Sequence, residues 1–399
     1  MTLSHVADSH AMQPYWNVLL ASVQADALHV ALELGVFFFL PAAPRARSLA
    51  SLIDTDAAAT RHLLDVLWSM GLVSRRADSA SGGTDYVYAL EAVASEHFVR
   101  TSPRFCGDAW TYRLTSLREA GAGLRGRLQP PVADEMNSAS TGVASTGVAS
   151  TGVASTGVAS TGVASNEAAA TGPASNRMPP ASSPPAARAA MGAVWAGAAR
   201  AQIGQEQRAF TADAACRVMA RVPVMATATR LLDLGGGPGW VAIELVRQHP
   251  QLQAVVFDWP ETAAVAQENI ISAGLEERLA VIGGDLAHDD IGTGYDVIWC
   301  ASVLHFVPDP AAALRRIHAA LRPGGVLVCA QAEVGATPQE AVKVLPYYLH
   351  MMMSGRHVTA AGNMAQALHG AGFTVVDSFV AHDFPMAPLT VWIATRAAA

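Results

Sequence analysis

A glycine-rich segment of the 399-residue chain carries the clearest chemical signal. Residues 231–239 read Leu-Leu-Asp-Leu-Gly-Gly-Gly-Pro-Gly, and a buried strand is predicted to end where the glycines begin a helix. Open α/β sheets bind ligands at such junctions. The glycines let a ligand touch the backbone and leave amides at the helix N-terminus free to bond it. Asp233, which opens the loop, would repel a pyrophosphate and suits a cationic ligand.

Two further acidic residues follow the next two predicted strands. Asp258 ends the run Val-Val-Phe-Asp, where a carboxylate can accept hydrogen bonds from both hydroxyls of a ribose. Asp285, followed by Leu286, comes after the third strand and is placed to accept a hydrogen bond from an exocyclic adenine amine. Each acid alone could be an ordinary turn residue. Three in order on successive strand ends predict a site for a nucleoside-containing cofactor.

These motifs resemble those of the class I S-adenosylmethionine-dependent methyltransferases. More specifically, residues 11–110 and 190–396 are similar to the small-molecule O-methyltransferases with an N-terminal dimerisation domain. The resemblance implies S-adenosyl-L-methionine as cofactor, a homodimer formed through the N-terminal helices, and a small aromatic secondary metabolite as acceptor. It implies a Rossmann-like, mostly parallel seven-stranded sheet whose last strand is antiparallel. The implied cofactor contacts are Asp233, Gly235, Gly237, Asp258, Asp285 and Leu286.

The resemblance also places a general base after the fourth strand. The family motif Leu-His is matched by Leu304-His305, and an acid that orients this histidine is matched by Glu333. The chemistry favours a base, because a phenol with a pKa near 10 is only about 0.1% ionised at pH 7. A positioned imidazole typically contributes about 10²–10⁴-fold. We therefore expect His305 and Glu333 to be catalytic.

Several positions depart from the family pattern. Phe306 follows the histidine where an aspartate is usual, Ala301 stands where plant members have a lysine, and no second acid is evident near residues 357–359. Trp240 is bulky for the start of the cofactor helix. Methylation of nitrogen, carbon or an already ionised oxygen would need less of a base, so those acceptors stay open as alternatives. The expected acceptor pocket is lined by Phe105, Trp110, Trp195, Phe306, Tyr347, His350, Met351 and Met353.

The elements that must position these residues can be read from the hydrophobic pattern of residues 189–399. Continuous apolar runs alternate with helical segments, which is typical of a parallel sheet covered on both faces. The expected strands are 230–234, 254–257, 279–282, 296–300 and 326–330. Helices are expected after the first two strands and over 310–321, where Pro323-Gly324-Gly325 stops the last one. Two final strands, 373–380 and 389–395, have a short connection and should pair antiparallel.

Residues 11–100 are predicted to form a winged-helix domain. A buried helical stripe runs from Tyr15 to Gly35, further helices start near Ser48 and Ala57, and a hairpin of strands 72–75 and 86–90 follows, with a turn at residues 81–83. The candidate recognition helix, 57–70, carries only Arg61 and His62 as basic groups, offset by Asp65. Because phosphate contacts dominate DNA affinity, we favour dimerisation. A winged-helix regulator with a vestigial cofactor site is the less favoured alternative.

Between the two regions lie connecting helices, expected over 101–136, and a low-complexity insert over 137–188. Residues 141–165 are the pentapeptide Thr-Gly-Val-Ala-Ser repeated five times. The repeat has no bulky or charged side chain and cannot form a core, so a disordered linker is expected.

Charge and composition exclude several classes. The chain has 26 basic and 33 acidic residues and a formal net charge of -7, without the basic footprint that nucleic acids or anionic membranes require. The longest apolar stretch, from Leu28 to Leu40, is too short to span a membrane and is broken by Glu33. The four cysteines show no CxxC spacing, which argues against a zinc or redox motif and a disulfide framework. We expect a cytoplasmic protein with buried thiols.

Overall fold

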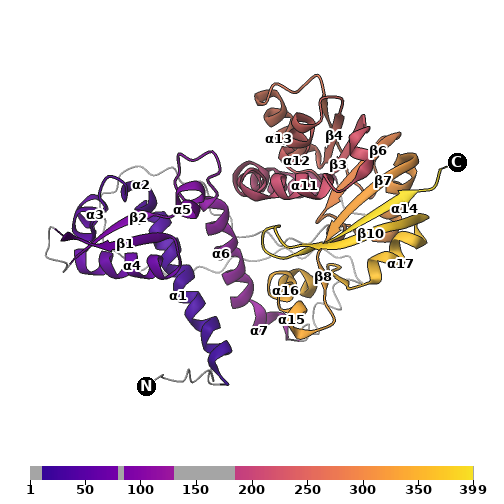
Figure 1. Ribbon diagram of the computed structural model, residues 1–399. Helices are drawn as coiled ribbons and strands as arrows, with labels where there is room; N and C mark the ends of the chain where they lie inside the picture. Colours follow the sequence, from indigo (N-terminus) through magenta and orange to yellow (C-terminus); the bar gives the residue numbers. More distant parts are fainter. Residues whose placement is uncertain (1–10, 80–84, 130–184, 399) are drawn as a thin grey trace, which may run out of the picture.

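The computed structural model describes residues 11–79, 85–129 and 185–398. A small, mainly helical N-terminal domain and a larger α/β domain lie on either side of helix α6 (Gly107–Ala122) (Figure 1). The pentapeptide repeats and the turn expected at 81–83 lie outside the described residues. So does the expected insert, except for its last four residues, which begin helix α9 (Pro185–Ala198).

The α/β domain is built on one seven-stranded sheet, whose first five strands along the chain are all mutually parallel. The last strand, β11, lies antiparallel between β10 and β7, as expected. The spatial order is β10 (Phe373–Ala381), β11 (Leu389–Arg396), β7 (Leu321–Gln331), β6 (Tyr295–Ala301), β3 (Arg230–Leu234), β4 (Gln253–Asp258) and β5 (Leu279–Gly283).

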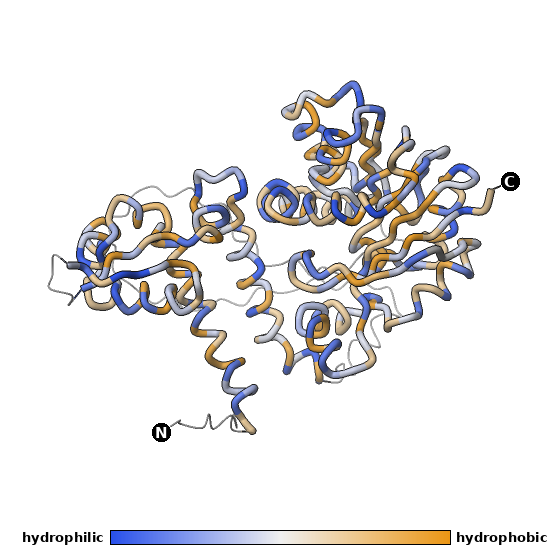
Figure 2. Tube along the Cα trace, in the orientation of Figure 1, coloured by the Kyte–Doolittle hydropathy of each residue, from blue (hydrophilic) through white to orange (hydrophobic). Residues whose placement is uncertain are grey.

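Helices cover both faces of the sheet because its central strands are apolar on both sides. Leu231 packs into one buried cluster and Leu232 into the other, as alternation along a strand requires. The first face carries α11 (Ala212–Met219), α12 (Trp240–Gln248) and α13 (Pro260–Ser272); the second carries α14 (Pro310–Ala320) and α17 (Asn363–Gly370). Apolar segments run through the sheet and polar ones lie on the outer helices and loops (Figure 2).

The strand boundaries expected from the sequence agree with the structure to within about two residues, with one exception. The strand expected to begin at Val326 begins at Leu321, directly after α14. Its register with β6 jumps, since Tyr295 pairs with Leu321 whereas Val297 pairs with Val326. Pro323-Gly324-Gly325 therefore form an irregular stretch inside β7, where proline and glycine are tolerated.

The N-terminal domain has its own core and the expected order of helices followed by a hairpin. Its elements are α1 (Gln13–Glu33), α2 (Val36–Phe39), α3 (Ala46–Leu52), α4 (Ala57–Ser69), β1 (Val73–Ala77), β2 (Tyr86–Leu90) and α5 (Ala92–His97). Asp56 caps α4 by accepting a hydrogen bond from the Ala59 amide, and Gly71 ends it with a φ of 71°. All four cysteines of the chain are buried and free, as expected.

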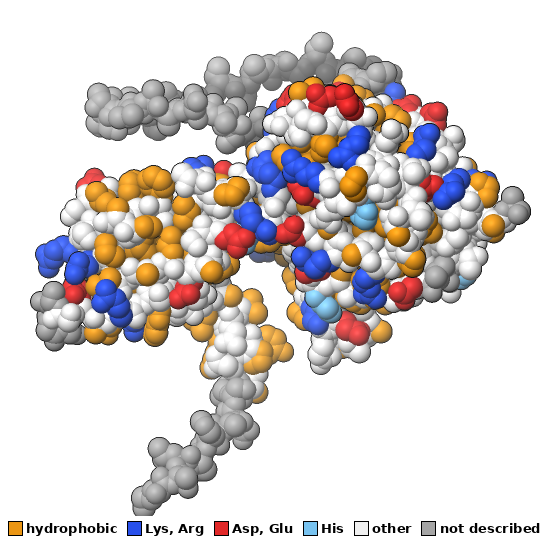
Figure 3. All heavy atoms as spheres, turned by 45° about the horizontal axis from the view of Figure 1, so that its top comes forward, with side chains coloured by type: hydrophobic (Ala, Val, Ile, Leu, Met, Phe, Trp, Pro, Cys, Tyr) orange, Lys and Arg blue, Asp and Glu red, His pale blue; other side chains and the backbone are white. Residues whose placement is uncertain are grey.

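The buried stripe expected along α1 is wrong for its first half. Leu28 and Ala31 are buried, but Tyr15, Val18 and Leu19 are 66%, 70% and 67% exposed. The first turns of α1 project beyond the domain, and hydrophobic side chains cover the projecting part (Figure 3). The sequence pattern therefore reports an apolar face that this single chain leaves uncovered. No helix among the described residues is long and apolar enough to cross a membrane.

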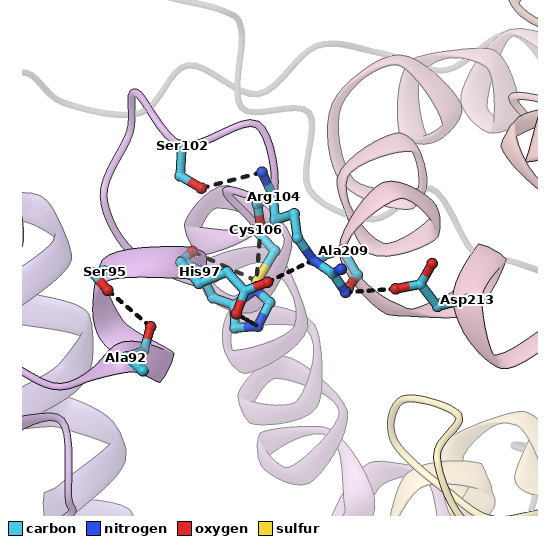
Figure 4. A network of polar contacts seen from close by, with 9 residues as sticks. Ala92, Ser95, His97, Ser102, Arg104, Cys106, Ala209 and Asp213 are labelled. Atoms are coloured by element: carbon cyan, nitrogen blue, oxygen red, sulfur yellow. Dashed lines mark hydrogen bonds and ion pairs between the residues drawn. The ribbon is translucent and has the colours of Figure 1, made fainter.

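The two domains are joined by polar contacts around Arg104. One guanidinium nitrogen lies 2.9 Å from Asp213 of α11 and also donates to the carbonyl of Ala209. On the other side, the backbone carbonyl of Arg104 meets the ring of His97 at 3.3 Å. Figure 4 shows these residues bridging the end of α5 and the helices before β3.

Candidate active site

A cavity of about 960 Å³ opens at the carboxyl ends of the parallel strands. Its volume is at the upper end of the roughly 300–1,000 Å³ of small-molecule sites. All the residues predicted to contact the cofactor line it: Asp233, Gly235, Gly237, Asp258, Asp285 and Leu286. His305 lines the same cavity, whereas Glu333 is not among its lining residues. Tertiary structure thus brings the three acids and the histidine to one site.

The glycine loop between β3 and α12 forms a backbone cradle. Gly235, Gly237 and Gly239 have φ angles of 68°, 59° and 82°, which favour glycine. The loop also packs closely on the segment that follows β6. A Cβ atom at position 235 would lie 2.3 Å from Cγ2 of Val303, two residues before His305. Glycine at 235 therefore lets the loop approach the segment that carries His305.

Asp233 is 1% exposed, and its Oδ2 has no hydrogen-bond partner among the described residues. Burial, and then the nearby charge of Asp258, raise the pKa of Asp233 to about 7. An ionised carboxylate is costly in such a place unless it is paired. A cation bound in the cavity would supply the missing partner.

The other two acids are already engaged by the backbone. Asp258 Oδ2 accepts from the Gly237 amide at 2.8 Å and Oδ1 from the Trp259 amide at 2.7 Å. Burial nevertheless raises the pKa of Asp258 to about 6, because it outweighs these hydrogen bonds. Asp285 Oδ1 accepts from the Ala287 amide at 2.9 Å, which fixes the carboxylate at the cavity wall.

These residues fit S-adenosylmethionine, which carries a sulfonium and an ammonium charge. The unpartnered carboxylate oxygen of Asp233 suits a cation, and the three consecutive glycines 235–237 have no Cβ atoms to obstruct a ligand. Asp258 lies at the end of β4, on the side of the loop where a ribose would lie. Both the types of these residues and their positions around the cavity match the chemical groups of S-adenosylmethionine, so the cavity can hold this cofactor.

His305 lies in a short 3-10 turn, Leu304–Phe306, and is 8% exposed. Its ring is 4.1 Å from that of Phe306 and 5.5 Å from that of Tyr348, centroid to centroid. Burial, and then the positive charge of Arg356, lower the pKa of His305 to about 4 against the opposing effect of a hydrogen bond with Gln331. The imidazole is therefore neutral at neutral pH and able to accept a proton.

Gln331, and not Glu333, meets His305. Gln331 is the last residue of β7 and donates to the carbonyl of Cys300 at 3.4 Å, which leaves its side-chain oxygen to accept from the imidazole. After Gln331 the chain leaves the sheet, and Glu333 enters a separate ladder of β8 (Glu333–Val334) with β9 (Thr359–Ala360). Thr390, Trp392 and the Met364 backbone lie near the Glu333 carboxyl, whose Oε1 has no hydrogen-bond partner among the described residues. This placement does not support an orienting role for Glu333.

Beyond the glycine loop the cavity is lined by aromatic side chains and methionines together with charged residues, among them Arg113, Arg127 and Glu206. Six of the eight expected pocket residues line it: Trp195, Phe306, Tyr347, His350, Met351 and Met353. Phe105 and Trp110 do not. Phe105 lines a separate hollow beside α2, and Trp110 packs on the core of the N-terminal domain. Apolar periodicity alone cannot tell a helix face that meets a cavity from one that meets a core.

Several residues of the site were not found from the sequence. Gln207 contacts the glycine loop, Arg113 and Glu206 form an ion pair in the cavity wall, and Gln331 contacts His305. None lies in a recognisable motif, because each reaches the site from a distant part of the chain. The sequence carries no signal for Glu206 and Gln207, because other polar residues such as Gln205 and Arg208 surround them.

The chain is similar to known O-methyltransferases. A family model described as the O-methyltransferase domain matches residues 201–374, and one described as the O-methyltransferase dimerisation domain matches residues 16–100. Together the two models match more than half of the chain.

Curated relatives match over part of their length. Demethylspheroidene O-methyltransferase of Cereibacter sphaeroides is 34% identical over 154 residues, which are 38% of this chain and 40% of that protein. The L-tyrosine C(3)-methyltransferase of Streptomyces lavendulae is 30% identical over 174 residues, which are 42% of this chain and 47% of that protein. The matched region thus spans less than half the length of these relatives.

The fold is shared with solved structures. The crystal structure of human N-acetylserotonin methyltransferase in complex with SAM is similar with a TM-score of 0.67 at 18% sequence identity, over 99% of both chains. At that identity the likeness shows the fold alone. With the two family models and the cofactor cradle, it leads to one conclusion: the chain belongs to the S-adenosylmethionine-dependent O-methyltransferases that have an N-terminal dimerisation domain.

Proposed function

We propose that the protein transfers the methyl group of S-adenosylmethionine to a hydroxyl of a small aromatic secondary metabolite. The observation that carries the proposal is the meeting of the glycine cradle, Asp233, Asp258 and Asp285 with a neutral His305 in one cavity. The aromatic wall formed by Trp195 and Phe306, whose rings are 5.0 Å apart, favours a flat, apolar acceptor.

In this proposal His305 removes the proton of the acceptor hydroxyl. The bound cofactor supplies an electrophilic methyl group. The hydrogen bond to Gln331 orients the imidazole, so that its other ring nitrogen is free to take the proton. Phe306 and Tyr348 pack against the imidazole and exclude water from it. The aromatic walls would hold a flat acceptor beside the cofactor site, and such positioning by itself accelerates transfer.

One observation favours a second function, methyl transfer to nitrogen or carbon by proximity. A base works best when its pKa is near the working pH, and the pKa of His305, lowered to about 4, makes it a weak base. One of the relatives is named as a carbon methyltransferase, acting on L-tyrosine. An acceptor with a more acidic hydroxyl would also need less assistance.

The test uses the full-length protein with S-adenosylmethionine and separate panels of phenols, aryl amines and activated aromatic carbons. Mass spectrometry detects the added methyl group, and NMR identifies the atom that carries it. Methylation of phenol oxygens supports the proposal. Methylation confined to nitrogen or carbon would replace it with the second function, and failure to bind S-adenosylhomocysteine would contradict both.

We also propose that the protein works as a homodimer that covers the projecting part of α1. Tyr15, Val18 and Leu19 form an exposed apolar face, and such faces on soluble domains usually mark an interface. Light scattering should give the mass of a dimer for the wild type and of a monomer for Leu19→Glu. Ser48→Glu on α3 introduces the same charge at another exposed position of the domain and should stay dimeric. A monomeric wild type would contradict the proposal.

A further inference from the structure

Three consecutive side chains before the cofactor loop reach different parts of the molecule. Gln205 contacts the N-terminus of α6, Glu206 contacts Arg113 in the middle of α6, and Gln207 contacts the glycine loop. They lie in a distorted helix, where the π-helical turns 199–203 and 207–211 flank a short α-helical turn, Gly204–Glu206. Such π-turns are rare and often occur at functional sites.

Gln207 holds both sides of the glycine loop. Its Nε2 donates to the carbonyl of Gly236 and its Oε1 accepts from the Trp240 amide, both at 3.0 Å. Trp240 is the first residue of α12, and the residue before it, Gly239, has no side chain that could cap the helix. Gln207 therefore supplies from a distant helix the acceptor that a capping side chain usually provides.

Glu206 holds the opposite wall of the cavity. Its carboxylate accepts two hydrogen bonds from Arg113, at 2.7 and 2.8 Å, and the third guanidinium nitrogen donates to the Tyr347 hydroxyl at 2.7 Å. Tyr347 belongs to α16 (Leu345–Met353), which carries several of the expected acceptor-pocket residues. This part-buried, bidentate arrangement is the strong form of an ion pair. It joins α6 to α16 across the acceptor side.

We propose that Glu206 and Gln207 are positioning residues that couple the cofactor loop to the wall of the acceptor pocket. The two residues are adjacent, so any change that fixes the backbone at Gln207 also restrains Glu206, Arg113 and Tyr347. A ligand that orders the glycine loop therefore orders α16 as well. By linkage, an acceptor that orders α16 tightens cofactor binding by the same factor. This inference rests on the proposed function, because it takes the glycine loop to be the cofactor site.

The experiment uses the full-length protein and S-adenosylhomocysteine, with affinity measured by calorimetry and ordering of α16 by hydrogen exchange. The wild type should bind, and binding should slow exchange in residues 345–353. Gln207→Met removes two hydrogen bonds but keeps a side chain of similar length. The dissociation constant for S-adenosylhomocysteine should rise about tenfold or more. Gln205→Met is the matched control, because Gln205 makes the same kinds of hydrogen bond, to the Ala109 amide and to Asp108, but contacts no cofactor residue. Its affinity should stay within about twofold of wild type.

Two further variants separate positioning from folding. Gln207→Glu keeps an acceptor for the Trp240 amide and loses the donor to Gly236, so its affinity should fall between wild type and Gln207→Met. Glu206→Gln should keep the affinity within a few-fold but lose the slowed exchange of α16. Wild-type affinity in Gln207→Met, or no ligand effect on α16 in the wild type, would overturn the inference and leave the proposed function intact. A wild type that does not bind S-adenosylhomocysteine would overturn both.

Discussion

The backbone amide of Gly237 donates a 2.8 Å hydrogen bond to Oδ2 of Asp258. The carboxylate expected to bind the ribose therefore also holds the middle of the glycine loop. Asp258→Ala removes both contacts, and the dissociation constant for S-adenosylhomocysteine should rise about tenfold to hundredfold. Asp258→Asn can still accept from Gly237 and should lose less. Calorimetry measures both, and unchanged binding in Asp258→Ala would remove this residue from the site.

Asp233 should make the ligand-free protein less stable as the pH rises. Its carboxyl has an ordinary pKa of 3.8 when unfolded and about 7 when folded. Between these values the folded protein binds more protons, so the contribution of Asp233 to the free energy of unfolding falls from about pH 4 to about pH 7.

Asp233→Asn removes this loss and should stabilise the ligand-free protein at pH 7.5 by on the order of 2–4 kcal/mol, at about 1.4 kcal/mol per pKa unit. It should also weaken cofactor binding, because the cation loses its carboxylate. Urea unfolding at several pH values, compared with wild type, checks the difference. His305 acts in the opposite direction between about pH 4 and 6.5 in both proteins, so its contribution cancels in the difference between the two curves. If the difference in free energy of unfolding between Asp233→Asn and wild type does not change with pH, the raised pKa of Asp233 is wrong.

Gly235 and Gly274 separate backbone strain from close approach. Both have positive φ angles, 68° and 65°. A Cβ atom at position 235 would lie 2.3 Å from Val303, whereas a Cβ atom at position 274 would have no neighbouring atom within 4 Å. Gly274→Ala should therefore cost about 1–2 kcal/mol of strain and bind S-adenosylhomocysteine normally. Gly235→Ala should cost more in thermal unfolding and weaken binding at least tenfold, because the loop must move. Equal effects of the two substitutions would show that strain alone decides.

His305→Ala should lower kcat by about 10²–10⁴ while affinity for S-adenosylhomocysteine stays within a few-fold. The rate is measured with the acceptor found in the panel. His318→Ala is a suitable control, because its ring packs on Phe373, away from the cavity. Near-wild-type kcat in His305→Ala with normal binding would leave proximity and orientation as the source of catalysis.

The pH profile of kcat tests the partnership of His305 with Gln331. Because the pKa of His305 is lowered to about 4, its titration should cause no inflection near pH 6.5. Gln331→Glu places a negative charge beside the imidazole, which should raise the pKa and move an inflection toward neutral pH. Glu333→Gln should leave the profile unchanged, since its neighbours are Thr390 and Trp392. A shift in Glu333→Gln and none in Gln331→Glu would restore Glu333 as the orienting residue.

The sequence by itself determined the positions of the strands along the chain, the glycine loop and the three acids at strand ends. These are local properties: apolar periodicity reports which faces are buried, and the residues of each motif adjoin the strand that positions them. The carboxyl ends of parallel strands lie at the same edge of a sheet, so Asp233, Asp258 and Asp285 must lie near one another. The uncovered face of α1 shows the limit of this reasoning, because an apolar stripe reports that a surface needs a partner without saying whether the same chain supplies it.

Tertiary structure alone decided which side chains from distant segments reach the site. Glu333 is two positions after Gln331, and alternation along a continued strand would place both on one face. The chain leaves the sheet between them, so Gln331 meets His305 and Glu333 meets β11. Likewise, Gln207 and Glu206 act on elements more than 25 residues away in the sequence. Local patterns cannot specify such contacts, since they depend on how the packed helices are placed against the sheet.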